Sequence, residues 1–118
     1  MSGRDHLEEP GPLSPVAFHT LLALHGAPLH GYAVMKEVEA TSGSATGPGA
    51  VYGAIQRLEE AGLIREGRRL EPSRGSRPRQ EYEITERGRI ALRAEARRFR
   101  RLAELVAQRK LVPGGNEP

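Results

Sequence analysis

Three arginines stand close together in the segment Ser73–Arg79, where their chemistry suits binding of a negatively charged partner. Arg74, Arg77 and Arg79 are separated only by glycine, serine and proline, and no acidic residue interrupts them. An arginine side chain presents a rigid fork of N–H donors that matches the oxygens of a phosphate group. The alternative is an ordinary solvated turn, so the neighbouring elements must decide between the two interpretations.

Catalytic and metal-binding chemistry finds no support in the residue pattern. The chain has no cysteine, which removes disulfides, thiolate metal sites and cysteine nucleophiles together. Its four histidines form no recognised metal-ligand motif, and neither a phosphate-binding glycine loop nor a serine-nucleophile motif occurs. Glu59 and Glu60 are adjacent, but neighbours on a helix point about 100° apart and do not converge on a substrate. We expect neither an enzyme nor a metal or other cofactor.

The segment before the arginine loop is predicted to be an amphipathic helix from Pro48 to Gly62. Proline suits a first helical turn because it has no amide proton to leave unpaired, and glycine suits a left-handed C-terminal cap. A period of 3.6 residues places Val51, Ile55 and Leu58 on the face that packs in a core. The opposite face and its flanks carry the residues that we predict to contact a partner, which are Gly49, Tyr52, Gly53, Gln56 and Arg57. Glu60 also lies on this face, but we do not predict a contact for it.

Two glycines on that outward face need an explanation, because Gly53 inside a helix costs about 1 kcal/mol relative to alanine. Small residues let a helix backbone approach a surface closely, as in the major groove of DNA. The alternative is that Gly49 and Gly53 are chance small residues in a glycine-rich chain. Strand-like runs at Leu63–Arg65 and Gln80–Ile84 flank the arginine loop. A helix followed by a basic two-stranded wing is the order of a winged helix-turn-helix, and it points to DNA.

Two further helices are predicted upstream. The first begins at the cap Ser14–Pro15 and ends at Gly26, and the second ends near Ser42–Gly43. Its expected core stripe is Tyr32, Met35 and Val38. The predicted fold is therefore mainly α with a small two-stranded β-wing. The winged helix-turn-helix domain covers residues 13–85, and residues 1–12 form a flexible N-terminal arm.

A long C-terminal helix over residues 86–111 is predicted to join two subunits, with a flexible tail at 112–118. Apolar residues recur there at steps of four and three, which predicts a seam that packs against a partner helix, and Leu102 and Leu105 widen this seam. The expected seam consists of Leu92, Ala96, Phe99, Leu102, Ala103 and Val106. The alternative is that the helix folds back on its own domain. Phe99 is the only aromatic residue of this helix, and it is also a candidate contact for a planar effector, unless it simply fills the dimer core.

Charge and composition agree with a small intracellular binding protein of 118 residues. The formal net charge is only +3, but most of the 18 basic residues lie between Arg65 and Arg101, and all of these are arginine. A basic wing of this kind is typical of nucleic-acid binders, whereas the arginines of 93–101 are interpreted as solvated helix surface. No apolar run approaches the roughly 20 residues needed to span a bilayer. The first residues also lack the basic segment followed by an apolar segment that is typical of a secretion signal. We expect a cytoplasmic protein without membrane contact.

The sequence also resembles the PadR-type transcriptional regulators. The matching motifs are Pro28–Tyr32, Pro48–Tyr52, Arg57–Ile64 and Arg77–Gly88, which together span nearly everything from about residue 14 to 109. Several ordered motifs at family-like spacing make the match far more specific than any one of them. Gly53, where the family often has a larger residue or proline, and a long wing over Arg65–Arg79 depart from the family pattern, so base contacts cannot be carried over.

The resemblance implies a homodimeric repressor that binds double-stranded DNA at a pseudo-palindromic operator and is usually released from it by a small molecule. It also implies that Tyr52, Arg77 and Arg79 approach the DNA, and that the C-terminal helix dimerises. The alternative function is a winged-helix protein-interaction module without DNA binding. Only the DNA-binding function predicts a basic wing together with a symmetric dimer.

Overall fold

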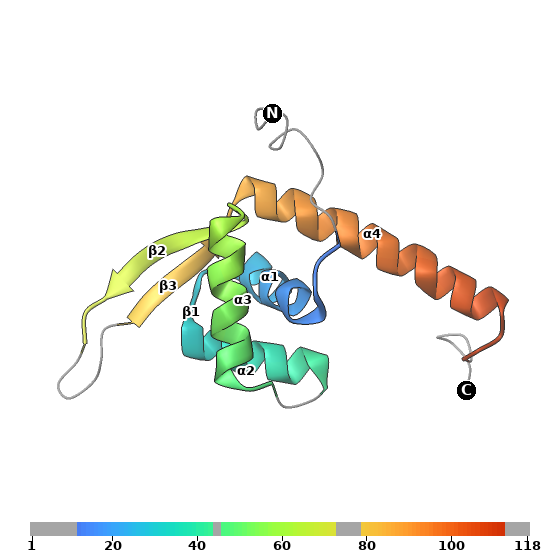
Figure 1. The fold of residues 1–118 in the computed structure, drawn as a ribbon, viewed down its shortest axis with the longest axis horizontal. Helices are drawn as coiled ribbons and strands as arrows, with labels where there is room; N and C mark the ends of the chain where they lie inside the picture. The colour runs from blue at the N-terminus through green and yellow to red at the C-terminus, as the bar shows by residue number, and fades with distance from the viewer. Residues whose placement is uncertain (1–11, 44–45, 73–78, 113–118) are drawn as a thin grey trace.

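The chain folds into four helices and a small antiparallel sheet, and the computed structural model describes residues 12–43, 46–72 and 79–112 (Figure 1). In chain order the elements are α1 (Pro15–Gly26), β1 (Leu29–His30), α2 (Gly31–Ser42), α3 (Pro48–Glu60), β2 (Ile64–Leu70), β3 (Arg79–Ile84) and α4 (Glu86–Gln108). Apart from Pro12 and Val112, the predicted arm and tail lie outside the described residues, as do Arg74 and Arg77. The predicted order of helices and wing is confirmed.

Side-chain caps and left-handed glycines set the helix ends. The Ser14 hydroxyl accepts a hydrogen bond from the Ala17 N–H at 3.2 Å, which caps α1 directly before Pro15. Gly43 follows α2 with φ of 76°, and Gly62 follows α3 with φ of 79°. These positive φ values favour glycine because a Cβ would be strained there. The helix ends that the sequence predicted at these positions are confirmed.

The hydrophobic core lies between α1, α2 and α3 and is closed by the strands and the first half of α4. Val51, Ile55 and Leu58 of α3 are buried, as their helical spacing predicted. Thr20 is buried among apolar residues, but its hydroxyl donates to the Val16 carbonyl at 2.8 Å and is thereby satisfied. The remaining core is formed by Ala17, Leu21, Leu24, Val34, Val38, Leu63, Ile64, Ile84, Ala91 and Leu92.

The sheet has three strands in the order β1-β3-β2, whereas the sequence predicted two. Leu29 and His30, directly before the second helix, pair with Tyr82 and Glu81 of β3. The His30 side chain also caps α2, because its Nδ1 accepts a hydrogen bond from the Ala33 N–H at 3.3 Å. Ala27, which precedes Pro28, is extended, as the residue before a proline usually is, and β3 offers an open edge with which the following residues pair. The wing strands are also longer than predicted, because β2 continues to Leu70 and pairs there with the first residue of β3.

The expected core stripe of the second helix was wrong in one member. Tyr32 is 57% exposed, while Gly31, Val34 and Val38 form the buried face of α2 and Met35 is half-buried. The helix α2 begins at Gly31, and Gly31 is the first residue of its buried face. A residue one position further along points about 100° away from that face.

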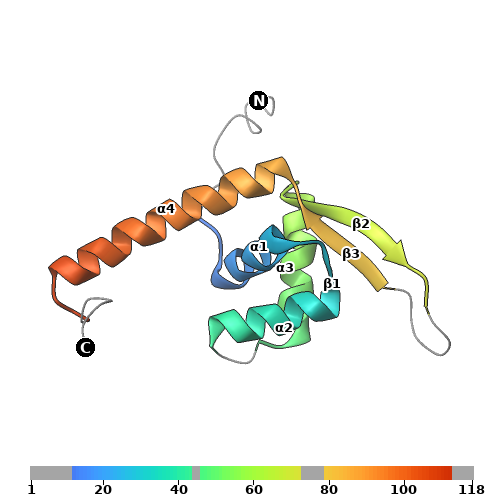
Figure 2. The same cartoon turned by 180° about the vertical axis from the view of Figure 1, so that it is seen from behind.

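The start of α4 is pressed against the turn between α3 and β2. The Thr85 hydroxyl donates to the Gly62 carbonyl at 2.7 Å and accepts from the Gly88 N–H at 3.1 Å. The Thr85 N–H donates to the Leu63 carbonyl at 3.0 Å. A Cβ at Gly88 would overlap the Leu63 carbonyl oxygen, so only glycine fits at this contact. From there α4 runs past α1, and its C-terminal half projects beyond the bundle in both views (Figures 1 and 2).

We predict that Gly88→Ala lowers the free energy of unfolding by about 1–3 kcal/mol, the usual cost of forcing extra volume into a packed contact. Denaturant unfolding measures the change. Gly49→Ala is the matched control, because a Cβ at that helical position meets nothing within 4 Å. Its stability should equal or slightly exceed that of the wild type. A Gly88→Ala protein that unfolds at the wild-type midpoint would show that this contact is not tight.

Candidate nucleic-acid interface

The solvent face of α3 carries the residues that the sequence predicted for it. Gly49 and Gln56 are exposed, Gly53 is half-buried, and Arg57 is exposed on the flank. A Cβ at Gly53 would lie 3.4 Å from Arg57 Nη1, so the arginine side chain folds over this glycine. The backbone of α3 is therefore accessible mainly around Gly49, in its first turn.

The wing adds exposed arginines beside this face. Arg79, which was predicted in the loop, is instead the first residue of β3 and is exposed. Arg65 is held on the wing by Glu83, whose Oε2 lies 2.8 Å from Arg65 Nε. Arg68 and Arg69 are both exposed although they are adjacent in β2. The register of β2 against β3 shifts between Glu66 and Arg69.

Sequence reasoning therefore missed Arg68 and Arg69 as candidate contact residues. The sequence predicted a strand only from Leu63 to Arg65, so it did not place these two arginines on the wing strand, which continues to Leu70.

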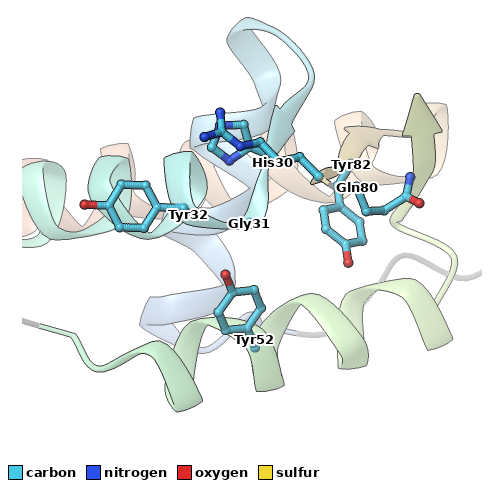
Figure 3. Close-up of a pocket in the computed structure, with 7 residues that line it drawn as sticks. His30, Gly31, Tyr32, Tyr52, Gln80 and Tyr82 are labelled. Carbon is cyan, nitrogen blue, oxygen red and sulfur yellow. The ribbon is translucent and has the colours of Figure 1, made fainter. Parts of the chain in front are cut away.

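A small cleft of about 240 Å³ separates the start of α2 from α3 and the base of the wing. It is lined by His30, Gly31, Tyr32, Tyr52, Arg79, Gln80 and Tyr82. Figure 3 shows the Tyr52 hydroxyl directed toward Gly31 and the Tyr82 hydroxyl directed toward α3, whereas the Tyr32 side chain lies apart from both. The Gln80 amide already donates to backbone carbonyls of the wing, including that of Gly67 at 3.1 Å. Tyr52 thus lies at the meeting point of α2, α3 and the sheet.

Burial, together with acidic residues near the base of the wing, raises the pKa of two groups. Burial raises the pKa of the Glu59 carboxyl above its ordinary value of 4.5, and the charges of Glu66 and Glu60 raise it further. Burial also raises the pKa of Tyr82 above 10.0, followed by the charges of Glu59 and Glu66. The Tyr82 phenol is therefore protonated at neutral pH and available as a hydrogen-bond donor.

The predicted dimerisation seam divides into two parts along α4. Leu92 is 6% exposed and belongs to the core of its own domain, so the fold-back alternative holds for this residue. Phe99 is 42% exposed and packs edge-on against Phe18 of α1, with ring centroids 4.8 Å apart. Further along, Leu102 and Leu105 are exposed. Ala96 and Ala103 are also exposed, and Val106 is half-buried.

A buried carboxylate fixes α4 to the start of α1. Glu95 is 4% exposed, and its Oε2 accepts hydrogen bonds from the Leu13 N–H at 3.2 Å and from Arg98 Nη2 at 2.7 Å. A buried charge is tolerated when it is paired and hydrogen-bonded in this way. The part of α4 up to Phe99 thus belongs to the domain, and the part beyond Phe99 extends away from it.

Three helices followed by an antiparallel hairpin, with an exposed third helix beside that hairpin, define a winged helix-turn-helix. The chain belongs to the transcriptional regulator PadR-like family, whose sequence pattern matches residues 20–94. This confirms the resemblance seen in the sequence. The family is one of transcriptional regulators and not of enzymes. Among the described residues, no helix has the length and apolar character needed to cross a bilayer.

Solved structures of similar fold include a PadR family transcription regulator from Clostridium difficile R20291. Its TM-score is 0.69 at 23% sequence identity, and the match covers 80% of this chain and 97% of that one. PadR of Bacillus subtilis, solved in complex with operator DNA, has a TM-score of 0.63 at 17% identity, covering 80% of this chain and 60% of that chain.

A curated relative is the "Uncharacterized 37.1 kDa protein in transposon TN4556" of Streptomyces fradiae. It is 42% identical over 86 residues, which are 73% of this chain. The matched residues span only 23% of that longer protein.

We predict that Glu59→Gln stabilises the fold at pH 7. The raised pKa means that the folded state binds the Glu59 proton more tightly than the unfolded state does. Stability from this group is therefore fully present below pH 4.5 and is lost as the pH rises through the folded pKa. Thermal unfolding should show a higher midpoint for Glu59→Gln at pH 7 and a smaller difference on acidification. Glu104→Gln, exposed on α4, is the control. An equal shift at every pH would contradict a titration effect.

Proposed function

We propose that this chain is a homodimeric transcriptional regulator that binds double-stranded DNA at a pseudo-palindromic operator. The observation that carries the proposal is the exposed face of α3 beside a wing whose described strands expose Arg68, Arg69 and Arg79, in addition to Arg65, which is paired with Glu83. The relative that was solved with operator DNA shares this fold. A two-fold axis in the protein would then be mirrored in the operator.

In this proposal α3 enters the major groove and the wing follows the backbone beside it. Gly49 in the first turn of α3 lets the helix approach closely, and the exposed amide of Gln56 can reach a base edge. The exposed arginines of the wing neutralise phosphates or enter the minor groove. Arg57 lies on the flank of α3, where it can contact the backbone.

The wing is tested by the salt dependence of binding to sheared genomic DNA and to a selected operator. Arg79→Ala should weaken binding to both DNAs alike and reduce the slope of log affinity against log salt by about 0.9 per lost phosphate contact. Gln56→Ala should change the preference between the two DNAs. Arg65→Ala is the matched control, because Arg65 is already paired with Glu83 on the wing.

Wild-type affinity and slope for Arg79→Ala would remove this residue from the interface. A wild-type protein with no salt-dependent DNA binding would instead favour the protein-interaction module.

We propose that the second half of α4 joins the two subunits. Leu102 and Leu105 are 45% and 47% exposed on an otherwise solvated helix, and a second copy of the same helix would bury them. Phe99 and Ala103 lie along the same stretch, while Leu92 contributes only to the domain core. Dimerisation would also add apolar burial to a chain whose own core is limited by its size.

Leu105→Glu should therefore convert the dimer to a monomer, because it would bury an unpaired charge between the helices. Leu105 is a sharper target than Phe99, whose ring also packs on Phe18 within its own domain. Mass in solution and circular dichroism measure assembly and folding separately. Arg100→Glu is the control, because at about 100° per residue it lies well away from the Leu102 and Leu105 face. A folded, dimeric Leu105→Glu protein would show that this face is not the interface.

We further propose that the regulator is a repressor that responds to a planar aromatic compound held near Phe99. Support comes from the half-exposed Phe99 ring and from Arg98, whose guanidinium carbon lies 5.8 Å from the ring centroid. Linkage requires that such a compound and DNA affect each other's affinity equally. Titration of planar compounds against free and DNA-bound protein should give different affinities. A compound that binds both states equally is not an inducer.

A further inference from the structure

Another cleft, of about 430 Å³, lies where the end of α1 meets the base of the wing and the start of α4, and we call it the α1–wing cleft. Its volume falls within the roughly 300–1,000 Å³ of pockets that hold small organic molecules. Among the described residues, none of α2 or α3 lines it. Figure 2 shows the end of α1, the base of the wing and the start of α4 together, with α3 behind α1. A molecule held in this cleft therefore leaves the exposed face of α3 free.

The α1–wing cleft has an apolar floor and a charged rim. Leu24 and Ile84 line it from the core and are buried. The rim carries two arginines and two glutamates, in the ion pairs Arg65–Glu83 and Arg89–Glu86. Charges of both signs, with the imidazole of His25 beside them, thus face one small space.

Both ion pairs are loose enough to accept a ligand. Arg89 Nη1 lies 3.7 Å from Glu86 Oε1, and both side chains are exposed. Glu83 Oε2 lies 2.8 Å from Arg65 Nε, and among the described contacts it engages no terminal amino group of Arg65. Exposed ion pairs contribute little net stability, because water competes for both partners. These side chains can therefore exchange part of their pairing for the charges of a ligand at small cost.

The end of α1 adds hydrogen-bond acceptors to the same cleft. The last four carbonyls of a helix have no partner within it. After α3 and α4, the residues Ala61 and Arg109 donate their N–H groups back to such carbonyls. In the part of the chain that the structure describes, no backbone N–H closes α1 in this way, because Ala27 is extended and Pro28 has no N–H. These carbonyls form the negative end of the helix dipole and favour an ammonium group.

We propose that the α1–wing cleft binds a free α-amino acid, whose carboxylate pairs with Arg65 and Arg89 and whose ammonium group pairs with Glu83 and the carbonyls of α1. A simple anion would place its charge beside two glutamates, and a simple cation would place its charge beside two arginines. A zwitterion offers a partner to both signs. The site is separate from Phe99 and from the face of α3, so it does not depend on the proposed function.

Thermal unfolding of the full chain with each of the common amino acids at millimolar concentration tests the site. A molecule that binds the folded state raises the midpoint of unfolding. We expect at least one amino acid to raise the midpoint in a saturable way, and calorimetry should show one molecule bound per chain. The N-acetylated form of that amino acid lacks the ammonium charge, and its amide lacks the carboxylate. Each should bind about tenfold or more weakly, the usual loss for a hydrogen bond to a charged group.

Variants of the rim locate the binding. Glu83→Gln and Arg89→Gln should each weaken binding of the amino acid by about tenfold or more. Both side chains are at the surface, so the variants should fold, and circular dichroism without ligand checks this. Arg93→Gln is the matched control, because Arg93 also pairs with Glu86, at 3.6 Å, but does not line the cleft. It should bind the amino acid like the wild type.

Three results would overturn this inference. If no amino acid raises the midpoint, the cleft is not an amino-acid site. If the N-acetylated form or the amide binds as tightly as the amino acid, the ligand is not recognised as a zwitterion. If Glu83→Gln and Arg89→Gln both keep the wild-type affinity, the amino acid binds elsewhere. Because each measurement is made without DNA, none of these results bears on DNA binding by α3 and the wing.

Discussion

The contact between the first turn of α4 and the turn that joins α3 to β2 is the constraint on which the rest of the molecule depends. Thr85 bonds to the Gly62 carbonyl and to the Gly88 N–H, and Gly88 lies directly on the Leu63 carbonyl. Four elements meet there: the end of α3, the start of β2, the end of β3 and the start of α4. The contact therefore sets the direction of the third helix and the wing relative to the long helix.

A second attachment makes α4 a rigid extension of the domain. Glu95 accepts a hydrogen bond from the N–H of Leu13, and Phe99 packs on Phe18. The helix α4 is therefore attached to α1 and to the segment before it about two and a half to three and a half turns beyond its start. Leu102 and Leu105 lie beyond this attachment and are exposed. If two copies pair through that half of α4, the two α3 helices are held at a fixed separation. A dimer with this property can read half-sites of fixed spacing.

Local rules predicted most of the fold, because helix ends depend on a few neighbouring residues. Ser14–Pro15 and the left-handed glycines 43 and 62 marked the helix ends, and helical spacing placed Val51, Ile55 and Leu58 in the core. Features that depend on distant partners were missed. The strand at Leu29–His30 exists because β3 offers an edge, and Leu92 is covered by its own domain and not by a second helix.

The candidate site was predictable in its location but less so in its details. An exposed α3 face and a basic wing follow from residue types and spacing. The pairing of β2 with β3 places Arg68 and Arg69 on a strand, and the close approach of Tyr52 to Gly31 joins residues that are twenty-one positions apart in the chain. Neither can be read from a single sequence, because both are contacts between segments that only the fold brings together.

The central claim is that two winged domains, held by α4, place their α3 helices on one side of a DNA duplex. Hydroxyl-radical footprinting on a DNA selected by the protein tests this most directly. The account predicts two protected segments related by two-fold symmetry, with centres about one helical turn of 10–10.5 base pairs, or a whole multiple of it, apart. A single protected segment, or two segments without symmetry, would contradict it.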